Sequence, residues 1–290
     1  MVNYNPKVWV ELIFHSYSKQ VLKTLLPALI FMGLFTATCC YLELTFLKSL
    51  PAFTTVHSLL GIVLGLFLVF RTNSAYERWW EGRKLWGSLV NSSRNFAMKL
   101  NAVLGQGMEE DRKWFAEMIS HFMWATKEHL RKGVVPDDME INNKIFLGQL
   151  KQAAHKPNRI ATAMYLKIEE LFRKNVITGF HLTNFDKEMK DFVDLMGSCE
   201  RIKKTPIPYS YTMYIKKFIF IYIITLPFGF IPTLGYYTIA VVLLVAFVLL
   251  SVELIAEEIE DPFGQDINDL PTDELTAAIK ANVKEILNVD

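Results

Sequence analysis

The sequence lacks several features that mark soluble enzymes and nucleic-acid-binding proteins. Its formal net charge is only +1 over 290 residues, so it has no global positive field to attract nucleic acid. Its three cysteines include no Cys-x-x-Cys pair and no disulfide ladder. It contains no GxSxG motif, no HExxH motif and no phosphate-binding glycine loop. We therefore expect no catalytic residues, no cofactor and no nucleic-acid partner.

Recognisable patterns for metal binding and secretion are also missing. His121 and His129 are eight residues apart in a predicted helix, which is a poor spacing for a shared metal ion. His57 lies at the outer end of a predicted membrane span, where a hydrogen-bonded or interfacial role is more common than proton transfer. The N-terminus has no short apolar core followed by a small-residue cleavage site, so we expect no cleaved signal peptide.

Charge is absent from three long runs, of 19, 22 and 35 residues, at 24–42, 49–70 and 218–252. About 20 apolar residues, rising about 1.5 Å each, cross the hydrocarbon core of a bilayer. The first two runs are therefore one span each. The third is long enough for two spans if it borrows residues from Tyr209 onward, where Lys216 and Lys217 can reach an interface.

A cluster of helix breakers supports dividing the third run, and consists of Pro227, Gly229, Pro232 and Gly235. These residues predict a tight turn at 227–237. Hydrophobic residues make up 51% of the chain and charged residues 21%, so the membrane part must be accompanied by a polar part. The sequence thus predicts four membrane-spanning helices and a large helical domain outside the bilayer.

The basic residues predict the orientation. The turn at 227–237 contains no Lys or Arg, and the loop at 43–51 contains only Lys48. Apart from Lys216 and Lys217 at the interface end of the third span, the other basic residues lie in the N-terminal segment, the middle segment and the tail. Because basic residues are concentrated on the cytoplasmic side of membrane proteins, we place both termini and residues 71–208 in the cytoplasm.

The chain accordingly divides into five predicted segments. They are a cytosolic N-terminal segment (1–23), two transmembrane helices (24–85), a cytosolic helical domain (86–208), two further transmembrane helices (209–255), and a cytosolic loop with an amphipathic helix (256–290). The middle segment shows apolar residues at helical spacing over 86–104 and 111–130. In the tail, Thr272 is the expected N-cap of a helix whose stripe of Leu275, Ile279 and Val283 docks on another element.

One face of the second span combines polar ends with an apolar middle. Its residues recur every four positions and so lie on one slowly drifting helix face: Ser58, Ile62, Leu66, Phe70 and Ser74. Gly61 and Gly65 beside this stripe allow close approach of another helix. The stripe fits either packing inside a bundle or a ring of apolar side chains around a pore, which excludes ions by dewetting when narrow.

Three segments carry a resemblance to a known family. Residues 70–87 read FRTNSAYERWWEGRKLWG, residues 197–218 read GSCERIKKTPIPYSYTMYIKKF, and residues 256–271 read AEEIEDPFGQDINDLP. Their order and spacing, and the four-span layout, resemble the bestrophin family in its bacterial branch. The resemblance covers almost the whole chain.

The resemblance implies a homopentamer with the second helices around one axial pore. The family's neck consists of three apolar residues, four apart, just before the arginine-rich run, which here are Ile62, Leu66 and Phe70. Ser58 and Ser74 then lie at the pore mouths. Animal members place two phenylalanines in the neck, whose positive ring edges are thought to help anions, and here only Phe70 is aromatic. The lower aperture falls near Thr183, which is polar where a branched apolar residue is expected.

The resemblance also raises calcium binding around the Asp-Pro-Phe-Gly segment at 261–264. The matching residues are all acidic, as hard oxygen ligands for calcium should be: Glu258, Asp261, Asp266 and Asp269. However, Ile267 and Asn268 interrupt an acidic run that is continuous in animal members. Carboxylates at a surface are usually solvated or paired with basic groups, so calcium is possible here but not favoured.

Taken together, the residues and the resemblance predict an all-α pentameric channel of the inner (plasma) membrane that conducts small monovalent ions passively. The family suggests chloride, whereas bacterial relatives suggest sodium or other cations, and the neck has no ring of charge that decides. A secondary transporter would show duplicated halves and buried ionisable groups, which are lacking here. The alternative is a membrane-anchored sensor or scaffold protein without conduction.

Overall fold

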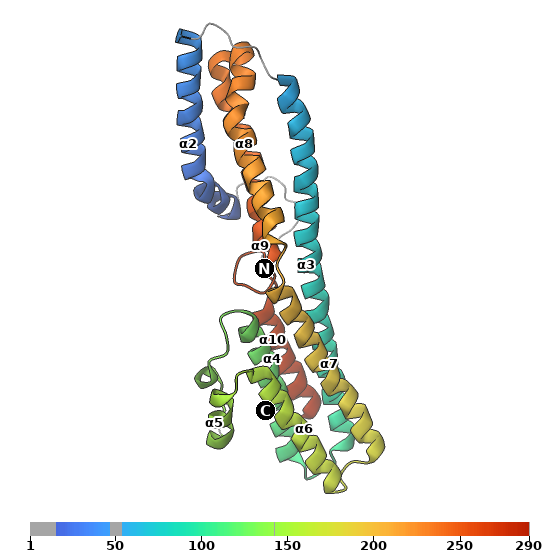
Figure 1. Ribbon diagram of the computed structural model, residues 1–290. Helices are drawn as coiled ribbons and strands as arrows, with labels where there is room; N and C mark the ends of the chain where they lie inside the picture. The colour runs from blue at the N-terminus through green and yellow to red at the C-terminus, as the bar shows by residue number, and fades with distance from the viewer. Residues whose placement is uncertain (1–15, 47–53, 142, 290) are drawn as a thin grey trace. The chain divides into compact units, whose positions relative to one another are not determined.

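A computed structural model describes residues 16–46, 54–141 and 143–289 of the chain (Figure 1). Within these ranges all regular structure is helical, which confirms the all-α prediction. The predicted N-terminal segment up to residue 15 and most of the loop around Lys48 lie outside the described residues.

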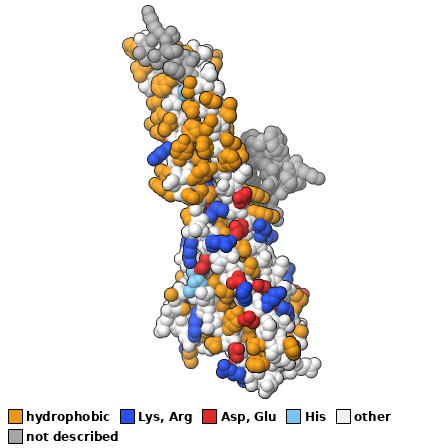
Figure 2. Space-filling view, turned by 45° about the vertical axis from the view of Figure 1, so that its right-hand side comes forward, with side chains coloured by type: hydrophobic (Ala, Val, Ile, Leu, Met, Phe, Trp, Pro, Cys, Tyr) orange, Lys and Arg blue, Asp and Glu red, His pale blue; other side chains and the backbone are white. Residues whose placement is uncertain are grey.

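Three stretches of the described chain are long and apolar enough to cross a membrane: Lys19–Phe46, Thr54–Val103 and Tyr209–Glu260. Figure 2 shows hydrophobic side chains gathered over one part of the molecule, while Lys, Arg, Asp and Glu side chains gather over the rest. An apolar outer surface of this kind is stable only in lipid or against another protein surface.

The chain folds as two compact units. The first, which we call the membrane unit, comprises Met1–Trp79 and Pro206–Glu260. The second, which we call the polar unit, comprises Trp80–Thr205 and Asp261–Asp290. Each unit is thus built from two separate pieces of the chain.

In the membrane unit, α2 (Ser16–Phe46), α8 (Tyr209–Leu234) and α9 (Thr238–Glu260) pack against one another. The 3-10 turn η2 (Gly235–Tyr237) joins α8 to α9. Gly235 has φ +53°, a left-handed conformation that glycine adopts without a steric penalty. The third apolar stretch is therefore two helices joined by a tight turn.

The turn is shorter than the sequence pattern predicts. Pro227 and Pro232 lie inside α8, and only Gly235–Tyr237 forms the turn. Proline in a helix removes one hydrogen bond but is tolerated in membrane helices, where neighbouring groups satisfy the freed carbonyl. The prolines therefore did not mark the helix end; the left-handed glycine did.

Helix α3 (Thr54–Val103) has 50 residues and is about 75 Å long at about 1.5 Å per residue. A hydrocarbon core is about 30 Å thick, so α3 must continue well beyond the bilayer. The second span and the helix expected over 86–104 are therefore one continuous element. Gly82 and Gly87 lie within it without ending it, because an isolated glycine only weakens a helix.

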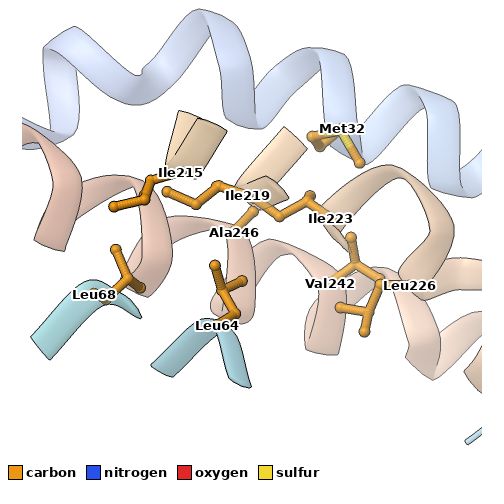
Figure 3. Close-up of a cluster of buried hydrophobic side chains, with 9 residues drawn as sticks. All are labelled: Met32, Leu64, Leu68, Ile215, Ile219, Ile223, Leu226, Val242 and Ala246. Carbon is orange, nitrogen blue, oxygen red and sulfur yellow. The ribbon is translucent and has the colours of Figure 1, made fainter. Parts of the chain in front are cut away.

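The core of the membrane unit contains side chains from α2, α3, α8 and α9 (Figure 3). They are Met32, Leu64, Leu68, Ile215, Ile219, Ile223, Leu226, Val242 and Ala246. Lipid tails are as apolar as leucine, so such a core is held by close packing rather than by escape from water. Leu64 and Leu68 are the residues through which α3 joins the other helices.

The polar unit contains the far part of α3 and six further elements. These are α4 (Glu109–Leu130), η1 (Pro136–Asp138), α5 (Lys144–Gln152), α6 (Lys156–Arg173), α7 (Gly179–Lys204) and α10 (Thr272–Leu287). At its centre, Phe96 of α3 meets Phe115, Phe185 and Phe192 edge to face, with ring centroids 6.0, 5.8 and 5.7 Å apart. Edge-to-face contacts are the favoured geometry for aromatic pairs, so this cluster ties α3, α4 and α7 together.

Helix α10 packs along α4, as the amphipathic tail pattern predicts. Ile279, Val283 and Leu287 are fully buried, whereas Leu275 is only half-buried. Thr272 is the first residue of the helix and not its N-cap, which is Pro271. The Thr272 hydroxyl instead accepts a hydrogen bond from Arg131.

Candidate functional site

One face of α3 is buried against the other helices of the membrane unit. Its residues recur at three-, four- and seven-residue intervals, which is one side of a helix: His57, Leu64, Leu68, Arg71 and Ala75. The His57 Nε2 lies 3.2 Å from the Thr225 hydroxyl of α8. This buried face determines which other side chains of α3 point away from the chain's own helices.

The predicted neck residues lie on the exposed side of α3. The exposed fractions are 72% for Ile62, 56% for Leu66 and 54% for Phe70. We call the row formed by Ile62, Leu66 and Phe70 the strip. Ser58, at one end of it, is exposed, and Ser74, at the other end, is half-buried. Leu59, seven residues before Leu66 and therefore on the same side of the helix, is exposed as well, so the apolar face of α3 contains more than these residues.

A buried charge cluster follows directly after the strip. The side chain of Arg71 is fully buried, and its Nη2 lies 2.7 Å from Glu260 Oε2 and its Nε 3.6 Å from Glu253 Oε1. Both carboxylates belong to α9 and are themselves largely buried. A buried guanidinium is stable only beside such partners, so this cluster determines the rotation of α3 at the end of the strip.

Further bonds converge on Glu260. Its carboxylate accepts a hydrogen bond of 2.9 Å from the Ile207 amide, and its backbone carbonyl accepts one of 3.1 Å from Arg78 Nε. Together these bonds connect α3, the end of α9 and the segment before α8. Sequence reasoning did not single out this cluster. The sequence feature that could have indicated it is that Arg71 and Glu253 each directly follow a long uncharged run.

The two glycines beside the strip have different surroundings. A Cβ added at Gly61 would lie 2.8 Å from the Tyr222 hydroxyl of α8, whereas one at Gly65 would meet nothing within 4 Å. The lack of a side chain at Gly61 therefore makes room for Tyr222 of the same chain. Gly65 leaves space on the outer side of α3.

Thr183, the residue predicted near the lower aperture, lies in the first turns of α7. It is exposed, and its hydroxyl donates a 3.1 Å hydrogen bond to the Gly179 carbonyl. It lines a small cavity with Tyr165, Ile168, Glu169, Leu182 and Asp186. Thr183 thus lies at the surface of α7 beside this cavity.

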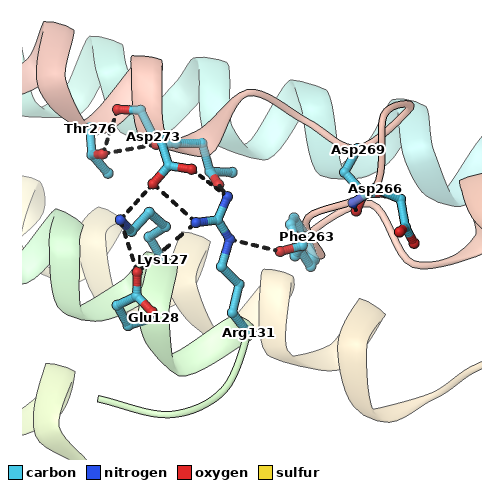
Figure 4. Close-up of polar contacts among 9 residues, drawn as sticks. Lys127, Glu128, Arg131, Phe263, Asp266, Asp269, Asp273 and Thr276 are labelled. Carbon is cyan, nitrogen blue, oxygen red and sulfur yellow. Dashed lines mark hydrogen bonds and ion pairs between the residues drawn. The ribbon is translucent and has the colours of Figure 1, made fainter. Parts of the chain in front are cut away.

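The four acidic residues predicted as calcium ligands have separate environments. Asp261 forms an ion pair with Lys203. Asp269 is buried, and its Oδ2 accepts a 2.6 Å hydrogen bond from the Asp266 amide (Figure 4). The Asp266 side chain is exposed, and Glu258 is half-buried in α9. At least two of the four carboxylates thus have protein partners.

The same loop is attached to α4 through Arg131. Its Nε donates to the Phe263 carbonyl at 3.3 Å, and its two Nη atoms donate to the Asp273 carboxylate at 3.0 and 2.8 Å (Figure 4). Lys127 Nζ lies 2.7 Å from the same carboxylate. The hydrogen bond from Arg131, then that from Lys127, outweighs partial burial and lowers the pKa of Asp273 from 3.8 to about 2.

This pairing predicts a pH-dependent contribution to stability. Because the folded pKa lies below the unfolded one, the contribution is present above about pH 4 and is lost as pH falls through about 2. Asp273→Asn should therefore lower the thermal midpoint of the purified protein at pH 7 and lower it clearly less near pH 2.5. Glu274→Gln, at an exposed neighbouring carboxylate, is the matched control. An equal loss from Asp273→Asn at both pH values would contradict the role of the ion pair.

Comparisons with known proteins agree with this architecture. The family model described as bacterial/fungal bestrophin protein matches residues 1–285. A voltage-dependent anion channel-forming protein of Nostoc is 37% identical over 234 residues, covering 79% of this chain and 76% of the relative. One of Ralstonia nicotianae is 27% identical and covers 96% of this chain and 92% of its own.

A solved structure has the same fold over nearly the full length. The bacterial bestrophin homologue from Klebsiella pneumoniae superposes with a TM-score of 0.85 at 25% identity, covering 90% of this chain and 98% of that one. The fold match, the family match over 285 residues and the identity to curated relatives all point the same way. The chain is a member of the bacterial and fungal bestrophin family.

Proposed function

We propose that this protein is an ion channel in which five copies assemble around one axial pore lined by α3. The observation that carries the proposal is the exposed apolar strip of Ile62, Leu66 and Phe70, which lies opposite a buried face anchored by Arg71. One chain contributes a single such helix and cannot enclose a path. A closed ring of identical subunits can.

In this ring the three side chains form the neck and Ser58 and Ser74 its mouths. An apolar constriction raises the energy of an ion by stripping its water, and it conducts when slightly wider. Thr183 of α7 is proposed to line a second aperture. Its exposed position at the start of α7 supports a surface role there.

We propose that the protein lies in the inner membrane and crosses it four times. Both termini and residues 71–208 are then in the cytoplasm. The support is the packing of α8 against α9 around the short turn η2, together with the lack of Lys and Arg at 227–237. Basic residues avoid the translocated side of short loops.

The permeant species are proposed to be small monovalent ions. The printed names of the relatives describe anion channel-forming proteins, which favours anions such as chloride over sodium. The strip itself carries no charge, so a salt gradient across a bilayer with the reconstituted protein is the decisive measurement. The sign of the reversal potential assigns the permeant ion.

The alternative is a membrane-anchored sensor or scaffold, and two measurements separate it from a channel. The mass of the purified protein in detergent should equal five copies. Liposomes containing it should pass more than about a million ions per second per assembly, faster than the microsecond-to-millisecond cycles of alternating access. A stable monomer without flux would favour the scaffold.

We also propose that conduction does not require calcium. Lys203 pairs with Asp261, and Asp269 Oδ2 accepts a hydrogen bond from the Asp266 amide, so calcium would have to compete with partners that two of the four carboxylates already have. Open probability in bilayers should therefore be unchanged between a chelator and micromolar calcium on the cytoplasmic side. A steep, reversible rise that Asp266→Ala abolishes would contradict this proposal.

A further inference from the structure

Two imidazoles and a carboxylate meet in the polar unit. They belong neither to the strip nor to the loop that contains Asp261, Asp266 and Asp269. His129 lies in the last turn of α4, His155 is the N-cap of α6, and Glu200 lies near the end of α7. The three elements pack against one another (Figure 1). Among the described residues these are the three whose ligand atoms lie within 4.8 Å of one another.

Both imidazoles face the same oxygen. Glu200 Oε1 lies 2.8 Å from His155 Nε2 and also contacts His129 Nε2. The ring centroids of the two histidines are 4.5 Å apart. Partial burial works to raise the pKa of Glu200, but the hydrogen bonds from His155 and His129 keep it below its ordinary value, so the carboxylate is anionic at neutral pH.

We propose that His129, His155 and Glu200 form a binding site for a divalent transition-metal ion, with zinc the best match. Two imidazole nitrogens and one carboxylate oxygen are a recurrent zinc ligand set that leaves a fourth position for water. The side chains are 22%, 28% and 17% exposed, so an ion can enter and a water can complete the coordination.

The distances fit after a small rearrangement. Zinc binds nitrogen and oxygen at about 2.0–2.2 Å, which places two tetrahedral ligand atoms about 3.3 Å apart. His155 Nε2 and Glu200 Oε1, which are 2.8 Å apart, therefore need to separate by about 0.5 Å, and His129 Nε2, which is closer to the same oxygen, by somewhat more. Lys204 Nζ, 3.5 Å from the other carboxylate oxygen, belongs to a side chain that is 66% exposed and can turn into solvent.

The hydrogen bond that His155 accepts at the start of α6 predicts that a bound metal ion can be removed by a chelator. The Nδ1 of His155 accepts a 3.2 Å hydrogen bond from the Asn158 amide, so the ring proton is on Nε2. When Nε2 binds a metal, the proton must occupy Nδ1 and the cap of α6 is lost. A site without a supporting acceptor for its histidine binds more weakly than one that has it, so zinc should leave on chelation without unfolding the protein.

The site would connect three helices and, through α4, the C-terminal loop. Arg131, two residues after His129, bonds to the Phe263 carbonyl and to Asp273. An ion that holds His129 therefore also restrains the part of α4 that holds this loop. The inference does not rest on conduction, because metal binding is measured on the purified protein.

The test uses the full chain in detergent, stripped with a chelator and then given zinc alone. Bound zinc is counted by elemental analysis after desalting, and affinity is measured by calorimetry. One zinc per chain is expected, with affinity falling at least tenfold in His129→Gln and in Glu200→Gln, since glutamine keeps a hydrogen bond but removes the ligand. His121→Gln, on the same helix but outside the cluster, should bind as the unchanged protein does.

Cobalt provides a readout that needs no variant. Bound in place of zinc, it should show the visible absorption of a nitrogen- and oxygen-ligated ion of low coordination number. Circular dichroism verifies that each variant is folded. Equal zinc content in His129→Gln and the unchanged protein, an equal loss in His121→Gln, or a cobalt spectrum like that of the free ion would each overturn the proposal.

Discussion

Replacing Leu66 by alanine is expected to raise the unitary conductance between about twofold and tenfold. Leu66 is the middle residue of the exposed strip, and alanine widens a ring of five side chains without adding charge. Each reduction of a barrier by about 1.4 kcal/mol raises a rate about tenfold, so even partial loss of the dewetting barrier is measurable. Single-channel recording of the reconstituted protein gives the value directly.

Leu244→Ala is the matched control, because Leu244 is a similarly exposed leucine that belongs to α9 and not to the strip. Its conductance should equal that of the unchanged protein. If Leu66→Ala leaves conductance unchanged in assemblies of the same mass, Leu66 does not form the neck.

Replacing Arg71 by methionine is expected to cost about 3–5 kcal/mol of folding stability, the usual effect of breaking a buried ion pair from one side. Methionine fills a similar volume but leaves the Glu253 and Glu260 carboxylates without their guanidinium partner. Because the cluster also sets the rotation of α3, the assembled state should be lost together with stability. Thermal unfolding and mass measurement in detergent report the two effects.

Arg94→Met tests the specificity of this effect, since Arg94 is exposed on the same helix and should tolerate the change. A second variant that combines Arg71→Met with Glu253→Gln and Glu260→Gln removes the charges that Arg71→Met leaves behind and should recover part of the stability. If Arg71→Met is as stable as the unchanged protein, the cluster does not hold α3.

The helices and their apolar runs could be predicted from the sequence because they depend on neighbouring residues. An uncharged run of 22 residues predicts a span whatever surrounds it, and the tail stripe of Ile279 and Val283 predicted a docked helix. The ends of elements were less predictable. Pro227 and Pro232 suggested a break that the environment of a membrane helix does not require.

The strip of Ile62, Leu66 and Phe70 was visible in the sequence as a four-residue repeat, and the family resemblance gave it a role. Which side of α3 it occupies was not visible, because helical periodicity defines a face without saying what the face meets. The buried positions of Leu64, Leu68 and Arg71 decide that the strip points away from its own chain.

The sequence by itself determined the class of this protein: its apolar runs require a membrane, and three motifs in order identify its family. Only the tertiary structure decided which charges meet. Arg71 pairs with Glu260, 188 positions apart not counting the two residues themselves, and Glu200 meets two histidines from other helices. Such pairings follow from how helices pack, and no local spacing encodes them, because a buried charge is stabilised by whatever partner the fold brings within a few ångströms.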